Sequence, residues 1–290
     1  MARHPPRPQN QGMKRPGLHL SRLLPVLFLL LLPASETCRA LAPTPAALAA
    51  FDAYINKLER SAAQHQPPGA AFAPANSPDV SPLHEGQFLI ENLAPPANLA
   101  LPGTAGIGAA LHHWRGRAFV PGAHAADFEA LLRNVPAYPN VFAPQVLRAE
   151  VLSRTADHLG VLMRVEQHHG LIVVLDTAYD VSFGRLDPQH AGTPGWSTYR
   201  STAIQEIDAA GTPREHALSP AEAHGFLWRL NTYWTFQERD GGLYLQIETV
   251  SLTRAIPHGL GWLVGPYAET IPRDSLAFTL RSACNALPRR

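Results

Sequence analysis

The 290-residue chain has little cysteine, with Cys38 and Cys284 as its two residues of this type. If residues 1–40 are removed on export, as argued below, Cys284 stands alone and the mature chain can form no intramolecular disulfide. A single cysteine also excludes a thiolate-rich zinc site. Cys284 falls on the apolar stripe of the last predicted helix, where a free cysteine behaves as a small hydrophobic residue.

Sequence motifs typical of catalytic and metal centres are also missing. The sequence contains no His-Glu-x-x-His or Gly-x-Ser-x-Gly run. Among its 14 histidines, His112-His113 and His168-His169 are adjacent pairs on predicted strands or at their ends. Neighbours on a strand point to opposite faces, so one pair cannot grip one ion. We therefore expect no metal and no cofactor, although separate histidines could still converge in three dimensions.

No apolar run in the sequence is long enough for a membrane span. The run at 23–33 has signal-peptide length, whereas a spanning helix needs about 20 apolar residues. Basic residues precede it, and Cys38-Arg39-Ala40 offers small residues at the two positions that signal peptidase reads. We expect cleavage after Ala40 and a periplasmic or secreted protein. An uncleaved anchor is the alternative.

Removal of residues 1–40 reverses the sign of the net charge. The whole chain has 24 Lys and Arg against 23 Asp and Glu. Six of the basic residues and one of the acidic residues lie in 1–40, which leaves 18 basic against 22 acidic residues and a net charge of −4. The basic character therefore belongs to the export segment, and we expect no nucleic-acid partner.

Composition divides the mature chain into an extension, residues 41–108, and one domain, residues 109–290. The extension contains a predicted helix at 46–64, a short strand at 87–93 and irregular stretches rich in proline and glycine. In the domain, alternating apolar residues predict seven strands. These strands lie at 112–120, 146–154, 159–167, 171–186, 196–207, 226–238 and 243–254.

Two helices complete the predicted domain. One lies at 125–132, directly after the first strand, and the other is an amphipathic helix at 272–287 that closes the chain. Seven strands spaced about 4.8 Å apart span roughly 30 Å, whereas one helix covers a strip about 10 Å wide. A cavity is therefore expected between the sheet and the last helix. Whether the helix at 46–64 fills or caps that space is left open.

This order of elements resembles the START-like superfamily, also called the helix-grip or polyketide-cyclase-like fold. The resemblance covers about residues 110–288 and rests on FVPG at 119–122, YPN at 138–140, the turn at 238–242 and the closing helix. The run at 259–266 resembles sequences of exported bacterial members of this superfamily. The resemblance implies an α+β fold in which a curved antiparallel sheet of about seven strands wraps on the C-terminal helix, after an N-terminal helical extension.

Eight side chains are expected to line the cavity, because they share strand faces with apolar residues or lie beside them. They are His112, Trp114, Met163, Tyr179, Arg200, Trp228, Trp234 and Glu248. A buried arginine needs an anionic or hydrogen-bonding partner, so Arg200 or His112 would meet the polar head of an apolar ligand. Alternatively, Arg200 pairs with a carboxylate such as Glu248, or the two faces are assigned in reverse. Glu248 lies where two apolar alternations conflict, which a β-bulge would reconcile.

Members of the superfamily bind lipids, sterols, quinones or polyketides, and a minority are enzymes. The resemblance therefore implies a hydrophobic partner, lipid-like or polycyclic, held by a monomer outside the cytoplasm. An enzyme of the cyclase, aromatase or dehydratase type is a second interpretation, in which one His, Arg or Glu moves protons. A protein-interaction module with a filled core is a third. No catalytic residue is predicted, and peripheral contact with a membrane is left open.

Overall fold

The computed structural model describes residues 42–65, 80–94, 108–168, 172–185, 193–255 and 261–289, without the side chains of 61–65 and 261–269. The chain divides into two compact units, Met1–Arg39 and Ala40–Arg290, and every described residue belongs to the second. The expected export segment and most of the irregular stretches of the extension lie outside this description, and of the run at 259–266 the structure describes the helical backbone of 261–266.

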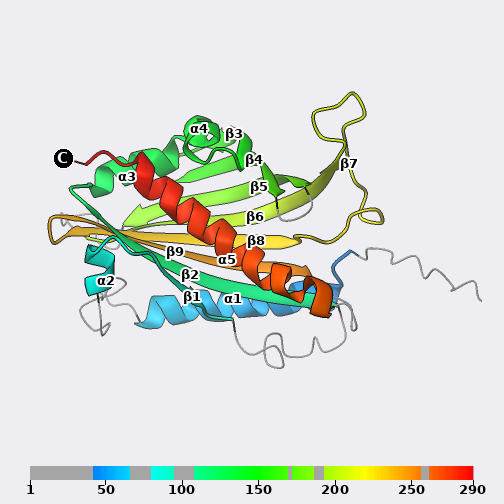
Figure 1. Cartoon of the computed structure of the whole chain (residues 1–290), viewed down its shortest axis with the longest axis horizontal. Coiled ribbons are helices and arrows are strands. Elements are labelled where there is room, and N and C mark those ends of the chain that lie inside the picture. The colour runs from blue at the N-terminus through cyan, green and yellow to red at the C-terminus, as the bar shows by residue number, and fades with distance from the viewer. Residues whose placement is uncertain are drawn as a thin grey trace, which may run out of the picture. The chain divides into compact units, whose positions relative to one another are not determined.

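The described strands form one antiparallel sheet of nine strands (Figure 1). Their order across the sheet is β1-β2-β9-β8-β6-β5-β4-β3, and β7 pairs with β6 beside this path. The bounds are β1 (Leu89–Asn92), β2 (Ala109–Pro121), β3 (Val146–Arg154), β4 (His158–His168), β5 (Ile172–Arg185), β6 (Gly195–Asp208), β7 (His216–Ala217), β8 (Arg229–Arg239) and β9 (Gly242–Arg254). All seven predicted domain strands are present, and β1 from the extension adds an edge strand beside β2.

Five helices are described: α1 (Pro45–His65), α2 (Ser81–His84), α3 (Ala125–Arg133), α4 (Tyr138–Val141) and α5 (Gly261–Ala286). The prediction that the last helix begins near Pro272 is wrong, because α5 starts eleven residues earlier, at Gly261. A proline inside a helix removes one backbone hydrogen bond, but here it does not end the helix. The architecture is otherwise the expected one, an α+β helix-grip fold with a curved, open sheet around a C-terminal helix.

Helix α5 packs most closely against β2, at Gly116. A side chain at this position would place its Cβ 2.7 Å from Leu276 Cδ2 and 3.0 Å from Leu280 Cδ2. Real Cβ atoms do not approach other atoms so closely, so a side chain here would force the ends of these two leucines to shift, and glycine lets the helix pack this near to the strand without that shift. We call the side of the sheet that faces Leu276 and Leu280 the α5 face.

Helix α1 covers the other side of the same strands. Its residues Ala47, Phe51 and Ile55 form an apolar cluster with Leu111 of β2 and with Val250 and Leu252 of β9. Along β9 these two residues alternate with Leu245 and Ile247, which belong to the core cluster around α5. Successive side chains of a strand point to opposite faces, so α1 lies on the opposite face, here called the α1 face. The N-terminal helix therefore does not fill the space beneath α5.

Candidate functional site

Two adjoining pockets lie between the α5 face of the sheet and helix α5. The first has a volume of about 150 Å³ and is lined by Tyr138, Tyr179 and Tyr199, among others; we call it the tyrosine pocket. The second, of about 230 Å³, is lined by Thr249, Ser251 and Thr253 of β9 and is called the threonine pocket. Both pockets share the residues Gln167, Leu175, Leu227, Leu230, Thr232, Ser275 and Thr279. They therefore form one continuous site.

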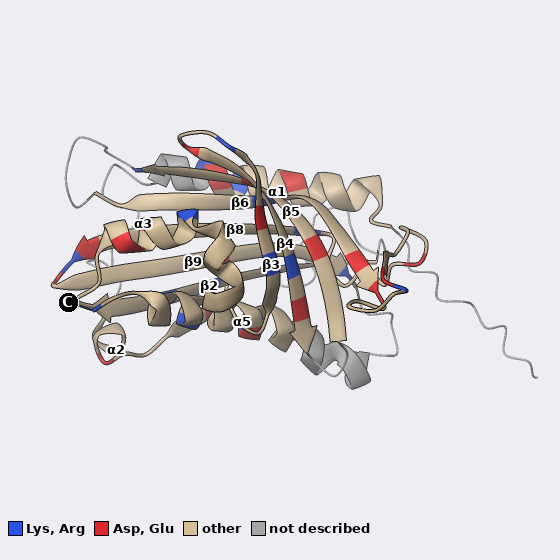
Figure 2. Cartoon of the chain, turned by 90° about the horizontal axis from the view of Figure 1, so that it is seen from above, with Lys and Arg blue, Asp and Glu red and all other residues tan. Residues whose placement is uncertain are grey.

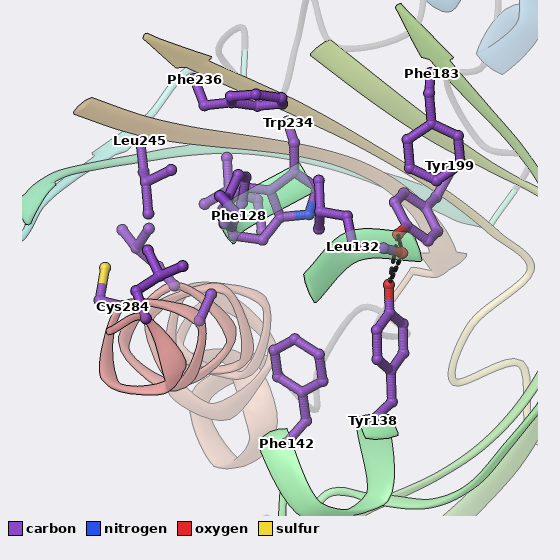
Figure 3. Packing of buried hydrophobic residues seen from close by; sticks show 14 of the residues in the cluster. Phe128, Leu132, Tyr138, Phe142, Phe183, Tyr199, Trp234, Phe236, Leu245 and Cys284 are labelled. Atoms are coloured by element: carbon purple, nitrogen blue, oxygen red, sulfur yellow. Dashed lines mark hydrogen bonds between the residues drawn. The ribbon is translucent and has the colours of Figure 1, made fainter. Parts of the chain in front are cut away.

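The tyrosine pocket ends at a buried pair of hydroxyl groups (Figure 3). The hydroxyl of Tyr138 donates to the carbonyl oxygen of Leu132 at 2.7 Å, and the hydroxyl oxygens of Tyr138 and Tyr199 lie 2.7 Å apart. Burial raises the pKa of Tyr199 to about 12 and the pKa of Tyr138 well above its usual value. Both phenols therefore stay neutral at physiological pH. Their hydrogen bonds tie α4 to β6 and to the C-terminal end of α3.

Aromatic packing forms the wall beside this pair. Trp234, which lines the tyrosine pocket, meets Phe128 of α3 edge to face with ring centroids 5.2 Å apart. Phe236, two residues along β8, meets the same ring at 5.1 Å, as Figure 3 shows. The carboxylate of Glu238 on β8 accepts a 2.9 Å hydrogen bond from the first backbone N–H of α3, at Ala125. This contact caps α3 and holds its aromatic ring against the strand.

Six serine and threonine side chains line the threonine pocket, and most of its other described lining residues are apolar. Thr249, Ser251 and Thr253 alternate along β9 and so share the α5 face, while Ser275 and Thr279 face them from α5. The hydroxyl of Thr253 lies 3.0 Å from Nε2 of His112 on β2. Among the residues that the structure describes, no Asp, Glu, Lys, Arg or His lines either pocket. The site is thus apolar and hydroxyl-rich, without a charge.

Five of the eight residues predicted for the site lie on the α5 face. Met163, Tyr179 and Trp234 line the tyrosine pocket. His112 lies beside the threonine pocket through its contact with Thr253, and Trp114, two residues further along β2, packs against the core cluster. These two residues face the same side without lining a pocket. Contact of any of the five with a ligand stays a prediction.

Arg200 and Glu248 lie on the α1 face, contrary to the predicted orientation. Arg200 donates two hydrogen bonds, of 3.1 and 2.8 Å, to one carboxylate oxygen of Glu59 on α1. Its neighbour Tyr199 takes the α5 face, so the alternative of reversed faces holds for β6. Strand β9 pairs with β2 and β8 without a register shift, so no bulge occurs at Glu248. Both apolar alternations of β9 are real, because α1 and α5 bury one face each.

Trp228 also belongs to the α1 face, where it packs against the apolar cluster of α1. The strand that was expected to begin at residue 226 begins at Arg229, so Trp228 precedes the regular alternation of β8. Leu227 lines both pockets instead. The difference arises because periodicity read from residue 226 assumes a strand conformation that the chain adopts three residues later.

A buried polar chain joins α1 to the sheet at Glu248. The Nε2 atom of His113 lies 2.7 Å from Glu248 Oε1, and Nε of Arg115 donates to Oε2 at 2.9 Å. Nδ1 of His113 lies 2.7 Å from the hydroxyl of Tyr54 on α1. Burial raises the pKa of Glu248, but the hydrogen bond from His113 and the charge of Arg115 outweigh it, so that pKa lies below its usual value. Glu248 is therefore a structural carboxylate.

Several residues of the site were not predicted from the sequence. Tyr199 was missed because its strand face was assigned in reverse, and Tyr138 was used for the resemblance but not for the site. The hydroxyl row of Thr249, Ser251 and Thr253 was visible as an alternation with Val250 and Leu252. The hypothesis of a β-bulge at Glu248 brings Val250 and Leu252 onto the same face as Leu245 and Ile247, and it therefore conceals the row.

Among the described residues, the side chains that could bind a metal ion are dispersed and the thiol of Cys284 is buried. Within these ranges no group of three or more His, Cys, Asp and Glu side chains is arranged to hold a metal ion. Cys284 is buried on α5, and burial raises the pKa of its thiol to about 12. It therefore packs as a neutral side chain. None of the described helices is both long and apolar enough to cross a membrane.

Comparison with known proteins finds similarity to solved structures. No protein-family model and no curated protein matches the chain. A STAR-related lipid transfer protein from Xanthomonas axonopodis is 16% identical, with a TM-score of 0.40, over 61% of this chain and 92% of that one. An aromatase/cyclase from Streptomyces sp. R1128 is 17% identical, with a TM-score of 0.35, over 61% and 88%. Human STARD10 is 9% identical, with a TM-score of 0.38, over 61% and 69%. At these identities and TM-scores the comparisons carry no argument about function, and the description of the fold rests on the strand order and the closing helix of this chain.

Proposed function

We propose that this protein binds a hydrophobic small molecule in the two joined pockets between α5 and the sheet. The observation that carries the proposal is the continuous, uncharged cavity, with volumes of about 150 and 230 Å³ in its two parts. Together they reach the lower end of the range of about 300–1,000 Å³ typical of ligand sites. Protein interiors are otherwise close-packed, with few voids larger than a water molecule. A filled core, as in a protein-interaction module, would not leave this space.

The lining favours a binding protein over an enzyme. General acid–base catalysis works best with a group whose pKa lies near the working pH. The ionisable groups that line the described cavity are tyrosines, and burial raises the pKa of Tyr199 to about 12 and that of Tyr179 further still. Neither phenol would give up its proton readily at neutral pH. A cyclase, aromatase or dehydratase would have to rely on orientation of the substrate alone.

The proposal places the protein outside the cytoplasm, on the basis of the predicted export segment at 1–40. It also takes the binding protein to be a monomer. The mature protein should then begin at Leu41, and N-terminal sequencing of the exported form tests this. Recovery of intact chain from Met1 in membranes would contradict a soluble exported protein. Peripheral contact with a membrane remains compatible with either result.

Native mass spectrometry of the protein purified from its own host tests the binding function directly. A bound species should accompany the folded chain and dissociate on unfolding. In parallel, the apolar dye Nile red should bind saturably and quench tryptophan emission, because Trp234 lines the tyrosine pocket.

A matched pair of variants places that binding in the cavity. Leu230→Trp adds a large side chain at a position that lines both pockets, and it should abolish dye binding. Leu152→Trp makes the same change at a leucine that is 62% exposed on the edge strand β3, and it should bind as the wild type does. Equal binding by both variants, or no saturable binding by the wild type, would refute the proposed function.

A further inference from the structure

We infer that the ligand is an electrically neutral molecule that carries hydroxyl or carbonyl oxygens along one part of an apolar body. This inference rests on the proposed function and concerns the same site. It narrows the ligand class in two ways, since it excludes fatty acids and amines and it assigns the oxygen atoms to the threonine pocket.

The exclusion of ions follows from the lining. Within the described ranges, no charged side chain and no histidine borders either pocket. An ionised carboxylate or ammonium group moved from water into such a site loses its hydration and gains no counter-charge. That transfer costs several kcal/mol or more. A neutral oxygen function has a much smaller cost, and a single hydrogen bond can offset it.

Three arginines on the strands of the sheet form ion pairs away from the pockets. Arg200 pairs with Glu59 and Arg115 pairs with Glu248, both on the α1 face. On the strands β4 and β5, Arg164 donates 2.7 Å hydrogen bonds to both carboxylate oxygens of Asp176; Figure 2 shows the acidic and basic positions along these strands. Moving any of these arginines into the cavity would leave its carboxylate partner without a positive charge beside it. An acidic ligand could therefore recruit none of these three arginines without breaking its ion pair.

The hydroxyl groups supply what a neutral oxygen function needs. Thr232 of β8 and Thr249 of β9 are direct partners in register, so their side chains stand side by side on the α5 face. Ser251 is the next residue of β9 on that face and is only 7% exposed. None of these three hydroxyls has a hydrogen bond to another described residue. Each can both donate and accept, which suits hydroxyl and carbonyl groups equally.

The two pockets therefore suit different parts of the ligand. The tyrosine pocket offers Met163, Leu175 and Trp234 to an apolar body, and its phenols are engaged with the protein's own oxygens. Thr232 lines both pockets, and from it the threonine pocket continues the free row with Thr249 and Ser251. A ligand with an apolar chain or ring system in the tyrosine pocket and an oxygenated end in the threonine pocket would match both linings.

Displacement of Nile red by four compounds that share a twelve-carbon chain tests the inference. These are monolaurin, 1-dodecanol, dodecanoate and dodecylammonium, used below their critical micelle concentrations at pH 7.5. We expect monolaurin to displace the dye most effectively, and to exceed both ions at least tenfold. Displacement by either ion as strong as that by monolaurin would overturn the inference while the proposed function stands. Failure of Nile red itself to bind would overturn the proposed function.

Two variants locate the oxygen contacts. Thr232→Val with Thr249→Val removes both paired hydroxyls at nearly constant volume and should weaken monolaurin roughly tenfold, with the affinity of Nile red measured directly for each variant. Thr235→Val is the matched control, because it makes the same change on β8 but faces α1. Unchanged monolaurin affinity in the double variant, or an equal loss in the control, would overturn the assignment. Thr249→Val alone, with a smaller expected loss, serves if the double variant does not fold.

Discussion

Helices α1 and α5 cover opposite faces of β2 and β9, and the polar groups on these two faces are arranged in opposite ways. On the α1 face, charges are present and paired, as in Glu248 with His113 and Arg115 and in Glu59 with Arg200. On the α5 face, the pockets are lined without a charge, and several hydroxyls are left without a partner among the described residues. The α1 face is a filled interface, whereas the α5 face encloses a space with unused hydrogen-bonding capacity.

The position of α5 explains why the space lies where it does. Gly116 lets the helix sit close against β2, near one edge of the sheet. One helix covers a strip about 10 Å wide, so the strands beyond β9 receive little cover from it. The tyrosine pocket lies there, over β4, β5, β6 and β8. Helices α3 and α4 close its far end through Leu132 and Tyr138.

The largest expected effect compares two aromatic residues of the same strand and face. Phe236 is 1% exposed and lines neither pocket, so Phe236→Ala should cost about 4 kcal/mol of unfolding free energy, within the range for a packed core. Trp234 borders the cavity and has fewer packing neighbours, so Trp234→Ala should cost about 3 kcal/mol or less in spite of its larger side chain. Urea denaturation measures both. A larger loss of unfolding free energy for Trp234→Ala than for Phe236→Ala would mean that the α5 face is as closely packed as the α1 face.

On the α1 face, Glu248→Ala should cost about 3 kcal/mol. Removing one partner of a buried ion pair leaves an uncompensated charge, which typically costs 3–5 kcal/mol. Arg115 is one-third exposed and can recover some hydration, so the low end applies. Glu150→Ala, at an exposed pair with Arg148 on β3, is the control and should cost less than 1 kcal/mol. Similar losses of unfolding free energy for Glu248→Ala and Glu150→Ala would show that water reaches the ion pair of Glu248 on the α1 face.

A smaller effect appears in the pH dependence of Glu248→Gln. The pKa of Glu248 in the folded protein lies below its ordinary value of 4.5. Stability from its ionised form is therefore complete above about pH 4.5 and is lost as the pH falls through the lower folded value. The difference in unfolding free energy between wild type and variant should narrow between pH 6 and pH 3. A difference that widens on acidification would mean that burial dominates and the pKa is raised.

Much of the fold could be predicted from the sequence, because alternation and helical spacing are local signals. The seven strands, the order of elements and α1 all follow from spacing within single segments. The orientation of a strand buried on both faces does not. In β9, Leu245 and Ile247 point one way and Val250 and Leu252 the other, and no local rule says which set faces α5.

The site was predictable only in part, for the same reason. Met163, Tyr179 and Trp234 lie on strands whose apolar face was assigned correctly. The partner of Arg200 is Glu59, which lies 141 residues away in the extension, so no local pattern predicts the pair. Trp228 was placed on the wrong side because the strand begins at Arg229. These differences all come from contacts that form only when α1 packs on the sheet.

The smallest expected effect is that of Arg200→Leu, and it separates the two faces most cleanly. If Arg200 lined the cavity, its loss would weaken acidic ligands selectively. Its guanidinium instead bonds Glu59 on the α1 face, where the two side chains are 39% and 32% exposed. A pair this exposed is largely screened by water, so the variant should lose less than about 1 kcal/mol of unfolding free energy. Leucine also keeps apolar contact with α1. Nile red and monolaurin should bind to Arg200→Leu with wild-type affinity, measured by the same displacement titration. Lys57→Leu, a change at another cationic residue that also removes one positive charge from the protein, controls for net charge. A selective loss of dodecanoate binding in Arg200→Leu alone would place this arginine at the ligand and reverse the assignment of faces on β6.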